Sequence, residues 1–182
     1  MQEIIKNMGR GTVDGRNLLT GKWGIKLLKG VNAKENNGIL EINFKDPENF
    51  NYSHSVKHAM IQADTYYRLS GYIKTEGLVD EQGVCLEVQD SRGWTKTRSA
   101  VHTEMIMGTN DWQYVDVIYK TLSDAESVVI IARRVGMHGP LKGRVFFKDV
   151  NLEQYNPDIK IPYLSVNASK SADGKTVYLM VI

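Results

Sequence analysis

Short segments that alternate apolar and polar residues, separated by turn-forming clusters, run through most of this chain. The clearest is 66–75, where Leu69 and Ile73 share one face while Arg68 and Tyr72 share the other. Alternation with a period of two places one face of a strand in a core and the other toward solvent or a ligand. The same pattern predicts four further strands, at 84–89, 112–119, 128–133 and 144–152.

The residues between these segments are strong turn formers. They cluster at 46–49, 80–83, 91–93, 108–111 and 136–143, and additional strands are predicted at 23–28, 38–44 and 52–61. No long stretch has apolar residues at three-to-four spacing, so we expect little helix. Eight or so short strands in a chain of 182 residues predict an all-β fold, an antiparallel β-sandwich of the jelly-roll type.

Apolar side chains of these strands would anchor one sheet on the other. The expected core residues are Tyr67, Leu69, Trp112, Val115, Val117, Val145 and Phe147. The single cysteine, Cys85, excludes an intramolecular disulfide framework. It lies inside an apolar strand pattern, which predicts a buried, unreactive thiol.

The pattern divides the chain into three parts. We expect a lead-in at 1–16, a jelly-roll module at 17–155 and a C-terminal hairpin at 156–182. Asp173-Gly174 between two apolar alternating segments is a typical hairpin turn. The chain ends inside an apolar segment, which suggests either an excerpt of a longer protein or a last strand placed in a sheet.

Composition excludes several partners. The net charge is +2, with 23 basic and 21 acidic side chains spread along the chain, so no basic surface for nucleic acid or an anionic membrane is expected. No apolar run approaches the roughly 20 residues of a membrane span. Residues 1–15 lack the apolar region of a secretory signal. Localisation is therefore undecided: extracellular if the sequence is an excerpt of a secreted enzyme, otherwise cytoplasmic.

Three segments, in this order, carry a family resemblance. They are Thr65 to Lys74 (TYYRLSGYIK), Gly108 to Trp112 (GTNDW) and Gly143 to Leu152 (GRVFFKDVNL). Together they resemble the carbohydrate-binding modules of the family four and nine type, which are galactose-binding-like jelly rolls. The likeness covers roughly 17–153 and implies a non-catalytic polysaccharide-binding module.

The hairpin carries a second resemblance. Residues 163–169 and 173–181 resemble the end of the C-terminal β-sandwich of α-L-arabinofuranosidases in glycoside hydrolase family fifty-one. This implies a covalently attached catalytic domain outside the sequence.

A sugar ring offers a C–H face and a rim of hydroxyls, so a site needs flat aromatic platforms and planar polar groups on a rigid surface. The resemblance places such a site on the concave sheet or on loops at one edge. We expect Trp94 and Tyr72 to stack on sugar and Glu87, Gln89 and Arg133 to bind hydroxyls. Neighbouring strands would add Tyr52, His54 and His102. The alternative for each is an ordinary solvent-facing side chain.

Many modules of this kind carry a structural calcium bound by oxygen ligands. Asp149 matches the aspartate of the closing strand, but Lys148 occupies a position that is often a second aspartate. The sequence therefore requires no cofactor and leaves a structural calcium open, with Asp149 alternatively bonding a nearby turn. His54 and His58 lie on a predicted strand, and His102 and His138 stand alone, so no transition-metal site is expected.

No catalytic constellation is evident. Glycoside hydrolysis needs two carboxylates across a cleft, and the sequence singles out no such pair, no nucleophile elbow and no zinc helix. We therefore expect a module that is not itself an enzyme and that targets an attached glycoside hydrolase to plant cell-wall polysaccharide such as xylan, arabinoxylan or β-glucan. Two alternatives remain: a ligand-free structural spacer, and a small jelly-roll glycan hydrolase or lyase.

Overall fold

The computed structural model describes residues 11–45, 51–136, 141–157, 166–171, 175 and 177–181. Its main body is a sandwich of two antiparallel sheets. The six-stranded sheet has the order β3 (Val31–Asn36), β4 (Ile39–Phe44), β11 (Lys142–Asn156), β6 (Tyr66–Val79) and β9 (Gly108–Lys120), with β1 (Thr12–Val13) paired to β11.

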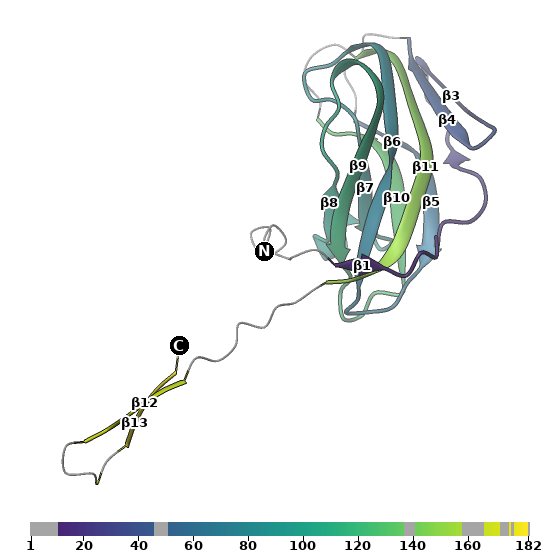
Figure 1. Ribbon diagram of the computed structural model, residues 1–182. Helices are drawn as coiled ribbons and strands as arrows, with labels where there is room; N and C mark the ends of the chain where they lie inside the picture. The colour runs from purple at the N-terminus through teal and green to yellow at the C-terminus, as the bar shows by residue number, and fades with distance from the viewer. Residues whose placement is uncertain are drawn as a thin grey trace.

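The five-stranded sheet lies behind the first in Figure 1. Its order is β2 (Gly24–Ile25), β5 (Tyr52–Met60), β10 (Ser127–Arg134), β7 (Cys85–Asp90) and β8 (Ala100–His102). A single helical turn, α2 (Trp94–Thr97), connects β7 to β8. The sheets and their antiparallel pairing confirm the predicted all-β sandwich.

The core forms where the apolar faces of both sheets meet. The six-stranded sheet contributes Tyr67, Leu69, Ile73, Val115, Val145, Phe147 and Leu152, and the five-stranded sheet contributes Leu86, Val88, Val128, Ile130 and Ala132. At Gly71 of β6, an added Cβ would lie 3.0 Å from Leu86 and 3.1 Å from Val150. A larger residue at this position would therefore require the side chains of Leu86 and Val150 to shift.

Two expectations about these strands need correction. The sequence missed β3, because its residues VNAKEN are mostly polar and their alternating burial is weak. Trp112 was predicted in the core, but it lies half-buried on the outer face of the six-stranded sheet. Trp112 lies three residues before the buried Val115, so alternation along β9 turns its side chain away from the core.

The ends of the chain bear on the expected domain organisation. Thr12 and Val13, placed in the lead-in, pair with Asn156 and Tyr155 at the end of β11. β12 (Val166–Lys170) and β13 (Val177–Val181) form the predicted hairpin as a two-stranded sheet of their own. The division into module and adjoining domain stays a prediction. Within the described part of the chain, no helix has the length and apolarity to span a membrane.

Candidate functional site

The outer face of the five-stranded sheet brings most of the predicted polar residues together. Leu86 and Val88 point into the core, so Cys85, Glu87 and Gln89 point outward on β7. Register places outward-facing side chains opposite one another: Glu87 beside Ile131 and His102, Gln89 beside Val129 and Ala100, and Cys85 beside Arg133. Strands far apart in the sequence thus build one polar surface.

Glu87 and Arg133 form an ion pair on this outer face. Arg133 Nε lies 3.3 Å from Glu87 Oε2, although it lacks the alignment of a hydrogen bond. Glu87 is buried. Burial raises the pKa of the Glu87 carboxyl, while the charges of Arg133 and His102 act in the opposite direction.

Gln89 connects this pair to the only exposed tryptophan among the described residues. With its amide oriented to satisfy both partners, Gln89 donates to Glu87 Oε1 at 3.2 Å and accepts from the backbone N–H of Trp94 at 2.6 Å. The Trp94 side chain begins α2 and is 48% exposed. The guanidinium of Arg98 lies 5.6 Å from the centre of its ring. The exposed indole of Trp94 therefore lies at the end of a row of polar side chains formed by Arg133, Glu87 and Gln89.

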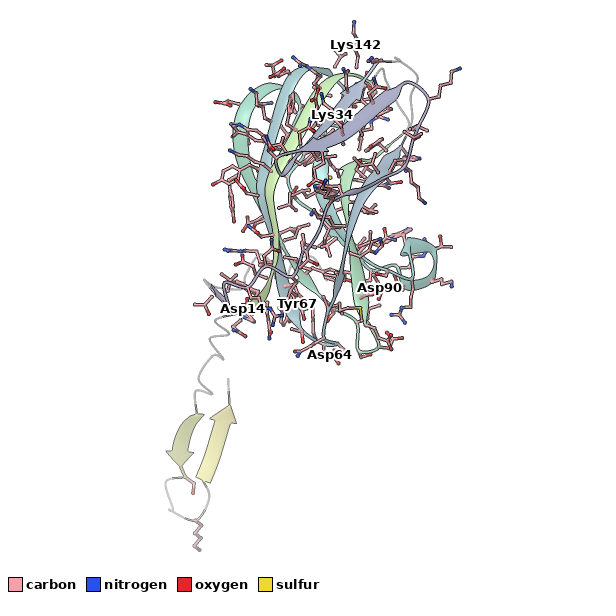
Figure 2. The ribbon with its side chains drawn as sticks, turned by 90° about the vertical axis from the view of Figure 1, so that its right-hand side faces the viewer. Asp14, Lys34, Asp64, Tyr67, Asp90 and Lys142 are labelled. Carbon is pink, nitrogen blue, oxygen red and sulfur yellow. The ribbon has the colours of Figure 1, made fainter. Side chains whose placement is uncertain are left out.

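A charged clamp holds the segment that carries Trp94. Arg92 donates from Nε to Asp90 Oδ1 and from Nη2 to Asp90 Oδ2, each at 2.9 Å. It also donates to both oxygens of Asp124, at 2.6 and 2.8 Å. Figure 2 shows Asp90 beside α2. Hydrogen bonds from Arg92 hold the pKa of Asp90 below its ordinary value. The clamp fixes the entry to α2 against the turn between β9 and β10.

Two predicted site residues lie elsewhere. Tyr72 faces outward, as alternation predicted, but on the six-stranded sheet, where it pairs with Tyr114 and Lys148. Tyr52 lies in the core at 1% exposure, and its hydroxyl shares a 2.7 Å hydrogen bond with Ser55 Oγ. Burial raises its pKa. The expectation that Tyr52 faces a ligand is therefore corrected.

A bulge in β5 explains where Tyr52 and His54 lie. Ala132 pairs with Ser55, but Arg134 pairs with Tyr52, so two residues of β5 face Arg133 alone. The extra residue turns Tyr52 into the core and leaves His54 opposite Arg133. Burial, together with the charge of Lys26, lowers the pKa of His54.

The six-stranded sheet carries a second aromatic surface, which the sequence did not single out. Lys148 Nζ lies 4.4 Å from the ring centre of Trp112 and 5.5 Å from that of Tyr72. The rings of Tyr72 and Tyr114 lie 5.5 Å apart and nearly edge-to-face. These side chains satisfy one another through cation–π and aromatic contacts. Register across β11, β6 and β9, which single-strand alternation does not reveal, brings them together.

Asparagine side chains lie around the backbone at Asp149, the residue expected to bind calcium. Asp149 is exposed, and no group of three or more His, Cys, Asp or Glu that could hold a metal occurs among the described residues. Asn17 donates to the Val150 carbonyl and to Asn151 Oδ1, and Asn151 donates to the Asp149 carbonyl. These amides brace the backbone, and a calcium ion at Asp149, which would need six to eight oxygen ligands, stays a prediction.

The thiol of Cys85, which the sequence predicts to be unreactive, allows the burial of this position on β7 to be tested directly. Cys85 is fully buried, and burial with the nearby Glu87 charge raises its pKa to about 12. Because the thiolate is the reactive form, we expect no reaction with a thiol-specific disulfide reagent at pH 8 in the native state. Full reaction should follow in denaturant. Rapid labelling of the folded protein would contradict the placement of Cys85.

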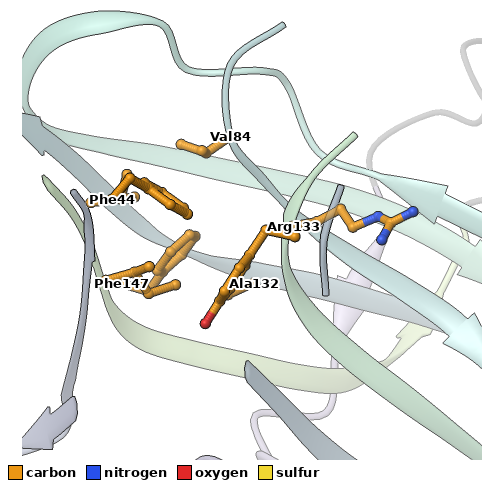
Figure 3. Close-up of a pocket in the computed structure, with 8 residues that line it drawn as sticks. Phe44, Val84, Ala132, Arg133 and Phe147 are labelled. Atoms are coloured by element: carbon orange, nitrogen blue, oxygen red, sulfur yellow. The ribbon is translucent and has the colours of Figure 1, made fainter. Parts of the chain in front are cut away.

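The gap in Figure 3 is not a ligand site. It lies between the sheets, is lined mainly by core side chains such as Phe44, Val84 and Phe147, and has no room for a water molecule. The candidate site is the outer face of the five-stranded sheet, where Glu87 is buried, Gln89 is half-buried and Trp94 is exposed.

No protein-family model and no curated protein matches the chain. Among solved structures, the chain is similar to a family 4 carbohydrate-binding module at 17% identity, over 69% of this chain and 78% of that chain, with a TM-score of 0.47. It is also similar to an endo-1,4-β-D-xylanase structure from Clostridium thermocellum, in which family 22 binding and family 10 hydrolase modules are complexed with xylohexaose. Identity there is 14%, over 79% of this chain and 28% of that chain, with a TM-score of 0.46.

A third similar structure is a cyclase from Fischerella, at 14% identity, over 65% of this chain and 63% of that chain, with a TM-score of 0.44. All three TM-scores are below 0.5, so the fold assigned to this chain rests on its own strand pairing.

Proposed function

We propose that this chain is a non-catalytic carbohydrate-binding module whose ligand surface is the outer face of the five-stranded sheet. The observation that supports it is the connected row of Arg133, Glu87 and Gln89, which ends at the exposed indole of Trp94. The ligand would be an oligosaccharide or polysaccharide that lies along this row.

The chemistry of the row suits a sugar. The indole of Trp94 offers a flat apolar surface for the C–H face of a pyranose ring. Carboxylate, amide and guanidinium groups can bond adjacent hydroxyls, and strands hold these groups more rigidly than loops would. Because Arg133, Glu87 and Gln89 are already partly buried and oriented by one another, binding would require little ordering of side chains.

The same geometry favours binding over hydrolysis. A raised pKa is useful in a general acid, but among the described residues no carboxylate contributes to the pKa of Glu87: the charged groups that influence it are Arg133 and His102. A glycosidase needs two carboxylates flanking the scissile bond. The alternative of a small hydrolase or lyase therefore has no support on this face.

The module would serve an attached catalytic domain. Holding a glycoside hydrolase near a long polymer raises the local substrate concentration even if each contact is weak. Xylan, arabinoxylan and β-glucan of plant cell walls are the polymers we propose, in line with the sequence resemblance. A ligand-free spacer is the remaining alternative and predicts no saturable binding.

Truncating Trp94 tests the site. We expect Trp94→Ala to weaken glycan binding about tenfold or more, because stacking and apolar burial are lost, while the thermal midpoint barely changes for so exposed a side chain. Calorimetry against xylan, arabinoxylan, mixed-linkage glucan, galactomannan and acidic glycans would measure this.

The matched control is Tyr114→Ala, which removes another aromatic of 50% exposure from the opposite sheet. It should leave binding unchanged. No binding of any glycan by the folded protein would contradict the proposed function. Loss of binding in Tyr114→Ala but not in Trp94→Ala would instead assign the site to the six-stranded sheet.

A further inference from the structure

We infer that the sugar recognised by this site carries a carboxylate, so that the ligand is a uronate-bearing glycan. This inference rests on the proposed function and adds the class of ligand. It comes from the charge balance of the outer face of the five-stranded sheet and from the burial and contacts of the Arg133 side chain.

Basic groups outnumber acidic groups on this face. Arg133 lies on β10, His58 lies opposite Val129 on β5, and His54 lies in the bulge opposite Arg133. His102 lies beside Glu87, Lys26 follows β2 near His54, and Arg98 covers the ring of Trp94. The acidic groups on these strands are Glu87 and Asp90, of which Asp90 is bound by Arg92, and Glu104 follows the end of β8.

On the six-stranded sheet, by comparison, most basic side chains have an acidic partner, and Lys148 lies over the rings of Trp112 and Tyr72. The pairs are Lys34 with Glu41, Arg68 with Glu153, Lys74 and Arg144 with Glu76, and Lys120 with Asp64. A chain with a net charge of only +2 has therefore collected more basic than acidic groups on the face that carries the candidate site, where Glu87 pairs with Arg133. An anionic ligand would complement that charge.

Arg133 is the group best placed to bind a carboxylate. Its side chain is only 17% exposed, and its contact with Glu87 is made through Nε, at 3.3 Å from Glu87 Oε2. This Nε is buried without a well-aligned hydrogen bond, and a ligand carboxylate would approach the two Nη groups instead. Figure 3 shows the guanidinium pointing away from the apolar core residues Phe44 and Phe147. A largely desolvated guanidinium gains most from a planar, bidentate acceptor such as a carboxylate.

A lower pH should strengthen the preference of this face for a ligand that carries a carboxylate. Histidine side chains gain charge as pH falls from 8 to 5, and Glu87, whose pKa burial raises, loses charge in the same direction. Burial and Lys26 lower the pKa of His54, so His54 gains its charge late. We therefore expect affinity for a uronate glycan to rise between pH 7.5 and pH 5.5.

The test uses matched polymers and the full chain. Glucuronoxylan and polygalacturonate are compared by calorimetry with the same polymers after reduction of their carboxyl groups to alcohols. We expect reduction to weaken binding about tenfold, the size of a charge-assisted contact, and Arg133→Gln to abolish that difference. His102→Gln, a milder change on the same face, should reduce it. Arg144→Gln on the opposite sheet should preserve it.

Equal affinity for native and reduced polymers would overturn the inference while leaving the proposed function intact. Equally tight binding of dextran sulfate would also overturn it, because charge alone would then suffice. No binding of any acidic, reduced or neutral glycan by the folded chain would instead contradict the proposed function itself.

Discussion

Replacing Asp80 with alanine is expected to lower the free energy of unfolding by about 3–5 kcal/mol, because it leaves a buried arginine without its carboxylate. Asp80 and Arg134 are both completely buried, with Arg134 Nη2 3.0 Å from Asp80 Oδ1. Arg134 also donates from Nε to Asp80 and from Nη1 to the Gly136 carbonyl. The carboxylate thus neutralises a charge that water cannot reach.

Denaturant unfolding followed by circular dichroism would measure this loss. The control is Glu41→Gln, which breaks the surface pair with Lys34 at 3.1 Å and should cost about 0.5 kcal/mol. The double variant Asp80→Ala with Arg134→Met removes both charges and should recover part of the loss. Equal effects of Asp80→Ala and Glu41→Gln would contradict the buried pair.

The buried pair also matters for the site. Arg134 fixes the end of β10 to the segment between β6 and β7, and the neighbouring residue is Arg133. Alternation at a well-anchored strand end sends Arg134 inward and Arg133 outward. Asp80→Ala should therefore weaken glycan binding as well as stability, although Asp80 does not lie on the outer face that carries the proposed site.

Much of this fold could be predicted from strand periodicity. Alternation assigned Leu69 and Ile73 to the core and Glu87 and Gln89 to an outer face, and the structure places all four accordingly. Periodicity within one strand does not say which sheet the strand joins. Tyr72 and Glu87 were therefore expected to share a surface, although β6 and β7 belong to different sheets.

Other features depended on irregularities that the sequence does not mark. The bulge that turns Tyr52 inward adds one residue to β5 with no glycine or proline to signal it. Trp112 looked like a core anchor because of its size, but the charge of Lys148 over its ring stabilises it on an outer face. The ion pair of Glu87 with Arg133 joins strands 46 residues apart in sequence, so only register reveals it.

Two adjacent phenylalanines on β11 allow the assignment of faces to be measured. Phe147 is 1% exposed and lies against Trp23, with ring centres 6.5 Å apart. Phe147→Ala should lower the free energy of unfolding by about 3–5 kcal/mol, because it removes buried apolar contacts and leaves a cavity. Phe146 is half-buried on the outer face, 5.7 Å from Arg144. Phe146→Ala should cost about 1 kcal/mol or less.

The same denaturant measurement on both variants tests more than stability. Phe147 pairs with Ile73 and Lys148 pairs with Tyr72, so the register that buries Phe147 is also the register that turns Tyr72 outward on the six-stranded sheet. A larger loss in Phe146→Ala would mean that β11 turns its other face, the one that carries Phe146, toward the core. Tyr72, which shares that face in this register, would then also face the core. The expected order, with Phe147 far more costly, would keep Tyr72 on the outer face of the six-stranded sheet, opposite to the face that carries Arg133, Glu87 and Gln89.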